Sequence, residues 1–208
     1  MNKTKKRNSN NKKTRKKRVF KKDDFVAGDG MLTAVWGPPM WHYLHTMSFN
    51  YPVNPSLEEK HNYRNFVLNL KNVLPCKYCR KNLKLNFKKL PLTMAHMSNR
   101  DSFSRYLYEL HELVNHMLKK KSGLTYCDVR ERYEHFRARC TDEHTESTNK
   151  PDSTNKTESS NKTESSKEKG CTEPLYGKKS KCVLNIVPKE EKVETFNVDK
   201  ECVKRREK

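Results

Sequence analysis

The strongest constraint on the fold is the spacing of apolar residues between Met31 and Cys140. In this segment they recur at intervals of three and four, for example at Tyr63, Phe66, Val67, Leu70, Val73 and Leu74. That spacing puts them on one face of a helix, and no stretch alternates with the two-residue period of a strand. We therefore predict an all-α bundle of roughly 110 residues, a common size for one domain.

Five helices are expected in this segment. Pro75 is placed to open the third helix, where its missing N–H costs nothing, and Asp101 is a plausible cap for the fourth. The first and fifth helices are marked by the faces Trp41, Leu44, His45, Ser48 and Val129, Tyr133, Phe136, Cys140, respectively.

The composition changes near residues 30 and 141, which divides the chain into a basic tail (1–30), the helical domain (31–140) and a low-complexity tail (141–208). Apolar residues make up only 33% of the chain, and residues 1–22 hold twelve lysines and arginines and no acid. Such segments cannot bury enough apolar surface to fold, so both tails are expected to be disordered. The basic tail suits weak contact with nucleic acid or an acidic surface; a solubilising or targeting tail is the alternative.

Targeting signals are few. No run of eighteen apolar residues predicts a membrane span, and the N-terminus lacks the apolar core of a secretory signal. The chain has seven cysteines, an odd number, so at least one is unpaired or pairs between chains. Without a secretory context, catalytic or metal-binding roles gain weight over a disulfide scaffold.

The pair Cys76-Lys77-Tyr78-Cys79 follows Pro75 directly. At the start of a helix, the free N–H groups and the helix dipole stabilise a thiolate, which makes this pair a candidate redox dithiol. The alternative is half of a zinc site. A structural zinc usually needs a second close pair of ligands, and Cys127 and Cys140 do not form one. We therefore expect no metal.

Two further pairs are spaced four residues apart, so each pair projects from one helix face: Trp41 with His45, and His111 with Asn115. Together they could clasp a planar heterocycle from two sides. Each pair alone favours the alternative of an ordinary core histidine or packed tryptophan, and only the combination with the CxxC favours a site.

Three motifs carry a family resemblance: the WGPxxWxxLH run at Trp36–His45, the CxxC at Cys76 and Cys79, and the HxxVN-like run at His111–Asn115. On these motifs the chain resembles the FAD-linked sulfhydryl oxidases of the Erv/ALR type, most closely those of large DNA viruses. The resemblance covers about Leu32 to Phe136.

The resemblance implies a four-helix bundle with a short fifth helix. It also implies a homodimer that binds FAD and oxidises thiol-containing protein substrates, passing electrons to molecular oxygen to give hydrogen peroxide. It implies that Cys76 exchanges disulfides with the substrate while Cys79 lies against the flavin. The residues assigned to FAD by this resemblance are Trp36, Gly37, Trp41, His45, Cys79, His111 and Asn115, with Lys119, Lys121 and Tyr133 as further neighbours. It also implies a location in the host cytoplasm or the virion.

The chain departs from the family pattern at several positions. Glu112 replaces the usual Asn, which removes one expected polar contact. The expected disulfide partner of Cys127 falls at about Tyr108, so Cys127 is predicted to be free. In the tail, a Cys171–Cys182 shuttle disulfide is possible, and incidental cysteines are the alternative. The rival function is a non-enzymatic helical interaction module whose basic tail binds nucleic acid.

Overall fold

The computed structural model describes residues 23, 26, 28, 30–141, 170–193 and 197–202 of the 208-residue chain. Residues 31–208 group as one unit, separate from residues 1–30, of which only four are described. The predicted disorder of the two tails, 1–30 and 141–208, falls largely on residues outside the described ones, above all 1–22 and 142–169.

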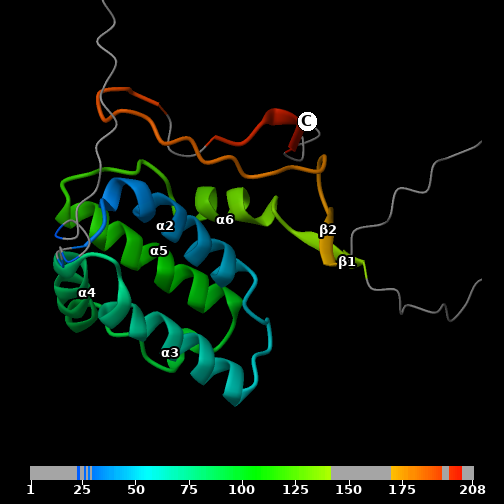
Figure 1. Cartoon of the computed structure of the whole chain (residues 1–208). Coiled ribbons are helices and arrows are strands. Elements are labelled where there is room, and N and C mark those ends of the chain that lie inside the picture. The colour runs from blue at the N-terminus through cyan, green and yellow to red at the C-terminus, as the bar shows by residue number, and fades with distance from the viewer. Residues whose placement is uncertain are drawn as a thin grey trace, which may run out of the picture. The chain divides into compact units, whose positions relative to one another are not determined.

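The described part contains five α-helices that form the predicted bundle (Figure 1). They are α2 (Thr33–Phe49), α3 (Leu57–Val73), α4 (Lys77–Lys89), α5 (Arg100–Met117) and α6 (Tyr126–Glu134), with a 3-10 helix η1 (Ala95–Met97) before α5. Helix α2 packs on α5, α3 packs on α4, and the short α6 contacts both α2 and α5. The prediction of an all-α bundle with a short fifth helix is confirmed.

The core lies between α2, α3, α4 and α5. Its fully buried members include Tyr51, Val67, Met97, Phe103 and Leu107. The polar tip of the buried tyrosine is paired, because the Tyr51 hydroxyl donates to the Met97 carbonyl at 3.0 Å. Pairing of this kind is needed for burial, since an unpaired hydroxyl in the core would lose its hydrogen bonds to water.

Most helices begin at a side chain that caps them. Ser56 begins α3 with a reciprocal pair of hydrogen bonds to Glu59, and Thr125 begins α6 in the same way with Asp128. Helix α5 begins at Asn99, whose side-chain oxygen accepts from the Ser102 N–H at 2.9 Å. The prediction that Asp101 caps this helix is therefore wrong.

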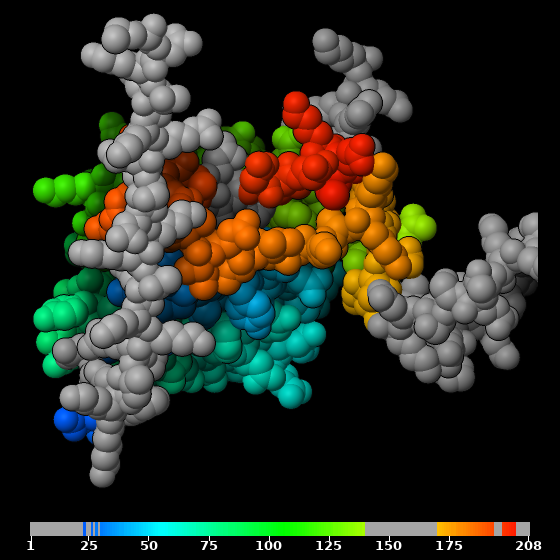
Figure 2. Space-filling view, turned by 45° about the horizontal axis from the view of Figure 1, so that its top comes forward, coloured from blue at the N-terminus to red at the C-terminus, as the bar shows by residue number. Residues whose placement is uncertain are grey.

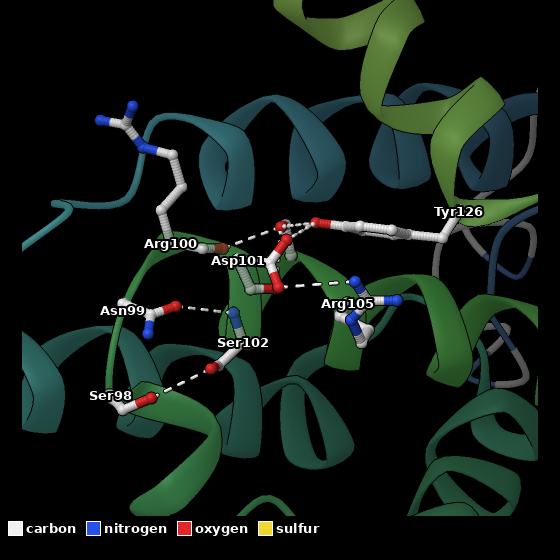
Figure 3. Close-up of polar contacts among 8 residues, drawn as sticks. Ser98, Asn99, Arg100, Asp101, Ser102, Arg105 and Tyr126 are labelled. Atoms are coloured by element: carbon white, nitrogen blue, oxygen red, sulfur yellow. Dashed lines mark hydrogen bonds and ion pairs between the residues drawn. The ribbon is translucent and has the colours of Figure 1, made fainter.

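Asp101 instead lies inside the first turn of α5, where its carboxylate binds Tyr126 of α6 (Figure 3). The Tyr126 hydroxyl donates to Asp101 Oδ1 at 2.9 Å and is also hydrogen-bonded to Ser104 Oγ at 2.8 Å. The Arg105 guanidinium lies 4.1 Å from the centre of the Tyr126 ring. Helix α6 is thus attached to the start of α5 by a polar network in which Asp101, Ser104 and the Tyr126 hydroxyl are all paired.

The expected continuation of the fifth helix through Phe136 and Cys140 is wrong. Helix α6 ends at Glu134, and β1 (Ala138–Thr141) pairs with the antiparallel strand β2 (Gly170–Pro174), with Ala138 opposite Pro174 and Thr141 opposite Gly170. Arg137 stabilises the change of direction, because its guanidinium binds the Glu134 carboxylate and donates to the Phe49 carbonyl at the end of α2.

The chain after β2 follows the bundle in an extended path. Figures 1 and 2 show this segment, drawn in orange, on the side of the molecule where α2 and α6 lie. Exposed ion pairs connect Lys178 with Glu201 at 2.7 Å and Lys179 with Glu173 at 2.9 Å. Among the described helices, none is long and apolar enough to cross a membrane.

Candidate redox and cofactor site

The dithiol lies at the start of α4, as predicted, but one position earlier in the helix than expected. Cys76 is the N-cap itself, with extended backbone (φ −154°), and its sulfur accepts a hydrogen bond from the Cys79 N–H at 3.2 Å. Pro75 therefore precedes the N-cap and is not the first helical residue. Both cysteines are free thiols and partly buried, so the structure shows the reduced dithiol.

The pKa values of the two thiols are shifted in opposite directions. Hydrogen bonds from the side chain and backbone of Cys79 lower the pKa of the Cys76 thiol below its usual value. Burial, and then the hydrogen bond to Cys76, raise the pKa of Cys79. Cys76 is therefore the sulfur that carries negative charge first, and Cys79 keeps its proton. This division suits a pair in which one sulfur exchanges with an external partner and the other faces the interior.

Helix α2 lies beside this dithiol. Thr33, in the first turn of α2, is within hydrogen-bonding distance of Cys79, with Oγ1 3.8 Å from Sγ. The backbone N–H of Met31 donates to the Pro75 carbonyl at 2.7 Å, and the Trp36 indole N–H donates to the Met31 carbonyl at 3.2 Å. The segment that begins α2 is thus attached to the loop that carries the cysteines.

The predicted ring residues of α2 and α5 do come together. The rings of Trp41 and His111 are stacked, with centroids 3.9 Å apart and planes 6° from parallel. His45 Nε2 lies 3.0 Å from His111 Nδ1. In this structure Trp41 and His111 stack on each other, so they do not clasp a ring between them. A planar ligand would extend the stack or separate the two rings.

Both histidines are held in the neutral state. Burial, aided by repulsion from His111 and His42, lowers the pKa of His45 to about 3, and burial lowers the pKa of His111 to about 4. Nδ1 of His45 is buried and has no hydrogen-bond partner. A buried N–H without a partner is rarer than a buried acceptor without one. We therefore assign the shared proton to His45 Nε2, which donates to His111 Nδ1.

Helix α6 extends this aromatic group. The Tyr133 ring stacks on Phe49, with centroids 5.6 Å apart, and lies 5.2 Å from the His45 ring. His42 Nδ1 is 3.3 Å from the Tyr133 hydroxyl. Burial raises the pKa of Tyr133 to about 12, so its hydroxyl stays protonated at neutral pH. Tyr133 therefore lies with the two histidines, as its assignment to the site requires.

Glu112, the position that departs from the family pattern, contacts a predicted site residue. The Asn115 side-chain N–H donates to Glu112 Oε1 at 2.9 Å. Because the amide nitrogen must face the carboxylate, the amide oxygen of Asn115 points away from it as an acceptor. Lys119 and Lys121 follow α5 with exposed side chains, and neither forms a hydrogen bond or ion pair through its side chain within the described residues.

Sequence comparison assigns the chain to a family. The model of the Erv1/Alr family matches residues 38–134. A probable FAD-linked sulfhydryl oxidase of Acanthamoeba polyphaga mimivirus is 35% identical over 99 residues, which is 48% of this chain and 68% of that protein. The FAD-linked sulfhydryl oxidase of African swine fever virus is 33% identical over 86 residues, or 41% of this chain and 70% of that protein. The chain belongs to the Erv1/Alr family.

The predicted resemblance is thereby confirmed, including the similarity to viral members. Among solved structures, the core of yeast Erv1 has 21% sequence identity and a TM-score of 0.45, and the match covers 60% of this chain and 96% of that one.

Two residues that contact this candidate site were not predicted from the sequence. Thr33 precedes Gly37 by four residues, so helical spacing from the WGPxxWxxLH run would have indicated the same face. His42 lies inside that run and contacts Tyr133. The spacing argument did not select His42, because it rested on the i, i+4 pair of Trp41 and His45.

The remaining cysteines are only partly as predicted. Cys127 is free and exposed, as expected. Cys171 is disulfide-bonded, whereas Cys182 and Cys202 are free, so the possible Cys171–Cys182 pair is not formed. In the described residues, no group of three or more His, Cys, Asp or Glu side chains is arranged to hold a metal ion.

Proposed function

We propose that this chain is an FAD-dependent thiol oxidase that forms disulfide bonds in protein substrates through Cys76 and Cys79. The activity and the cofactor are supported by membership of the Erv1/Alr family and by the names of its viral members. The observation that carries the proposal for this chain is the dithiol itself. It has an acidic Cys76 at the N-cap of α4 and a Cys79 that faces α2. The rival, a non-enzymatic interaction module, gives no reason for that arrangement.

The thiol chemistry follows from the two acidities. With the Cys76–Cys79 disulfide formed, a substrate thiolate attacks Sγ of Cys76, the disulfide breaks, and Cys79 leaves as a thiolate. A second substrate thiolate then attacks the substrate sulfur of this mixed disulfide, forming the product disulfide and releasing Cys76. Since a thiol of low pKa leaves faster, the lowered pKa of Cys76 favours this second step. Two electrons and two protons remain on the enzyme dithiol.

Bound FAD supplies the two-electron oxidation that restores the enzyme disulfide, with molecular oxygen as acceptor and hydrogen peroxide as product. The residues of this chain fit a long, flat cofactor lying along α2. Gly37 is buried, and a Cβ there would meet only the Thr33 methyl group, at 3.6 Å. Further along the helix, the Trp41–His111 stack offers a flat surface, and His45 Nδ1 is a buried polar atom without a partner.

We propose that Trp36, Gly37 and Cys79 contact the flavin end of FAD. We propose that Trp41, His45, His111, Asn115 and Tyr133 contact the rest of the cofactor. Thr33 and His45 are twelve residues apart on α2, a rise of roughly 18 Å, so these residues form an extended site. We propose only a peripheral contact for Lys119 and Lys121, because both lie exposed after α5.

Purified protein gives a direct test. The full chain should retain flavin absorbance through gel filtration and consume oxygen when a small dithiol is added. The Cys79→Ser variant should keep the flavin absorbance and lose the oxygen consumption. A colourless chain that stays colourless after refolding with FAD would refute the proposal, as would a Cys79→Ser variant of normal activity.

We further propose that the chain acts as a homodimer and works in the host cytoplasm or the virion, as expected from its family. Light scattering of the purified protein measures the first, and antibody labelling of fractionated infected cells measures the second.

For residues 1–22 we propose weak contact with nucleic acid or an acidic surface. Loss of retention on a phosphate-rich matrix after deletion of residues 1–30 would support it, and unchanged retention would contradict it.

A further inference from the structure

The outer side of α4 carries exposed residues that the bundle does not use. Four lysines and two apolar side chains form this surface, which we call the lysine face: Lys77, Lys81, Lys84, Lys88, Tyr78 and Leu85. The exposed fractions are 70% for Tyr78 and 54% for Leu85, high for large apolar side chains. On the opposite side of the same helix, Leu83 and Asn86 are buried in the bundle.

Helical geometry gathers these side chains into two parallel stripes. With 3.6 residues per turn, the four lysines fall within an arc of about 60°. Tyr78 and Leu85 fall next to them, on the same exposed side. The face is therefore a row of positive charge with an apolar row beside it, running from the first turn of α4 to its last.

This arrangement disfavours the helix that carries it. Lys77 and Lys81, like Lys84 and Lys88, are like charges at i, i+4, which repel each other. Lys77 also lies at the positive end of the helix dipole, where acidic residues are favourable. The first turn of α4 contains no acid, whereas the first turn of α3 contains Glu58 and Glu59.

No compensating partner is found among the residues that the structure describes. Residues 77–89 include no acid, and none of the four lysines forms an ion pair with any described residue. Four unpaired lysines in a row thus weaken the helix without an internal benefit. Since the described residues do not complement this charge, another molecule is the candidate partner.

The location of the lysine face indicates which molecule. It begins at Lys77, between the two cysteines, and extends along α4 for a rise of roughly 16 Å to Lys88. A polypeptide whose thiol reaches Cys76 can therefore place its neighbouring residues on this face.

We propose that the lysine face binds acidic residues that flank the cysteine of the thiol substrate, with Tyr78 and Leu85 contacting an apolar side chain of the same segment. The preferred substrates are then acidic polypeptides. This inference rests on the thiol oxidase function proposed above. A polypeptide is favoured over a nucleic acid because one end of the face lies at the cysteines, which react with thiols.

The test compares two peptides with the same cysteine-containing core, one flanked by Asp and Glu and one flanked by Lys, with a small dithiol as reference. At low ionic strength, we expect kcat/KM to be about tenfold or more higher for the acidic peptide. High salt should remove most of the difference, because exposed charges are screened. Equal rates for both peptides at low salt would overturn the proposal.

Variants locate the effect. The triple variant Lys81→Gln/Lys84→Gln/Lys88→Gln should lose most of the preference and keep small-dithiol turnover, since Lys77 beside the cysteines is retained. The variant Lys81→Glu/Lys84→Glu/Lys88→Glu should prefer the basic peptide. The matched control removes three exposed lysines outside α4, with Lys181→Gln/Lys189→Gln/Lys192→Gln, and should behave like the natural chain.

The outcomes separate the two proposals. If the natural chain does not oxidise the small dithiol, the oxidase function itself is wrong. If it oxidises the dithiol but the glutamine triple variant keeps its peptide preference, the lysine face is not the docking surface. If that variant keeps its peptide preference and loses only the retention of a single-stranded oligonucleotide, the face binds nucleic acid and the proposal is overturned.

Discussion

The start of α5 and the start of α4 belong to the same bundle but differ in how fully their polar groups are paired. At the start of α5, which we call the paired end, Asn99 caps the helix and Asp101 binds Tyr126 (Figure 3). At the start of α4, a thiol serves as the cap and the first turn has no acid. The histidine pair between α2 and α5 resembles the second case, because one buried nitrogen of His45 lacks a partner.

The difference separates stability from reactivity. A satisfied network holds α6 in place and leaves nothing free to react. A cap of low hydrogen-bonding strength, by contrast, leaves the Cys76 sulfur available for exchange. Functional sites commonly break the local rules that the rest of the chain follows. Substitutions at the start of α4 should therefore change activity, whereas substitutions at the paired end should change stability.

The largest effect is expected from Cys76→Ser, which gives α4 an ordinary cap. Thiol oxidase turnover should fall by roughly three orders of magnitude or more, because the exchanging sulfur is lost. The free energy of unfolding should stay the same or rise by up to about 1 kcal/mol, since serine is a preferred N-cap. Oxygen consumption measures the turnover, and urea unfolding measures the free energy of unfolding. A variant that is both inactive and strongly destabilised would contradict the division.

The second effect concerns pH. The pKa values of about 3 for His45 and about 4 for His111 lie below the ordinary 6.5. Between 6.5 and those values the unfolded chain binds protons that the folded chain does not, so stability should fall as pH falls through that window and should not change with these groups above it. At pH 5 the loss is about 2 kcal/mol for each histidine relative to pH 7.

Thermal unfolding between pH 7 and pH 4.5 measures this loss. His111→Gln should reduce the slope, because one of the two groups no longer titrates. Tyr126→Phe, at the paired end, should shift the whole curve and keep the slope. Equal slopes in all three proteins would show that the histidines are not held neutral by burial.

At the paired end, Tyr126→Phe removes the hydroxyl that binds Asp101 and Ser104. We expect a loss of about 1–2 kcal/mol in the free energy of unfolding, since a buried Ser104 hydroxyl loses a partner. Turnover of a small dithiol should stay normal, because no hydrogen bond in the described part of the chain links this network to Cys76 or Cys79. A fall in turnover with unchanged stability would show that this network serves the site.

The smallest effect compares two thiols at helix caps. Asn99→Cys places a thiol at the N-cap of α5, where Asp101 in the first turn disfavours its ionisation. In the reduced protein at pH 7, we expect alkylation there to be slower than at Cys76 by about tenfold. Peptide mass spectrometry after a short pulse of iodoacetamide gives both rates in one sample. Equal rates would mean that the surroundings of Cys76 do not activate it.

The bundle was predictable because each long helix carries its own apolar period, as the face around Val67 and Leu70 illustrates. The residue that caps a helix was less predictable. Asn99 and Asp101 are both good capping residues, and only the backbone conformation distinguishes them. Likewise, Pro75 is compatible with either side of the N-cap. In both cases the alternative N-cap positions lie only one or two residues apart, and a local sequence pattern cannot fix a helix end that closely.

Contacts between helices were harder to foresee. Spacing showed that Trp41 and His45 share one helix face and that His111 and Asn115 share another. It did not show that Trp41 and His111 stack directly on each other. The strand Ala138–Thr141 was missed because it is four residues long and its partner begins at Gly170. A period cannot be read from so short a segment, and the pairing that stabilises it is distant in sequence.

The pairing of β1 with β2 has a consequence for how this chain can change over evolutionary time. The low-complexity run 142–169 begins where β1 ends and ends where β2 begins, so its two ends are held next to each other whatever its length. The entropy of closing a flexible loop grows only with the logarithm of its length, and doubling it costs about 0.6 kcal/mol. A change in the length of this run therefore costs little closure entropy, so the length can differ between related proteins while the helical bundle stays the same.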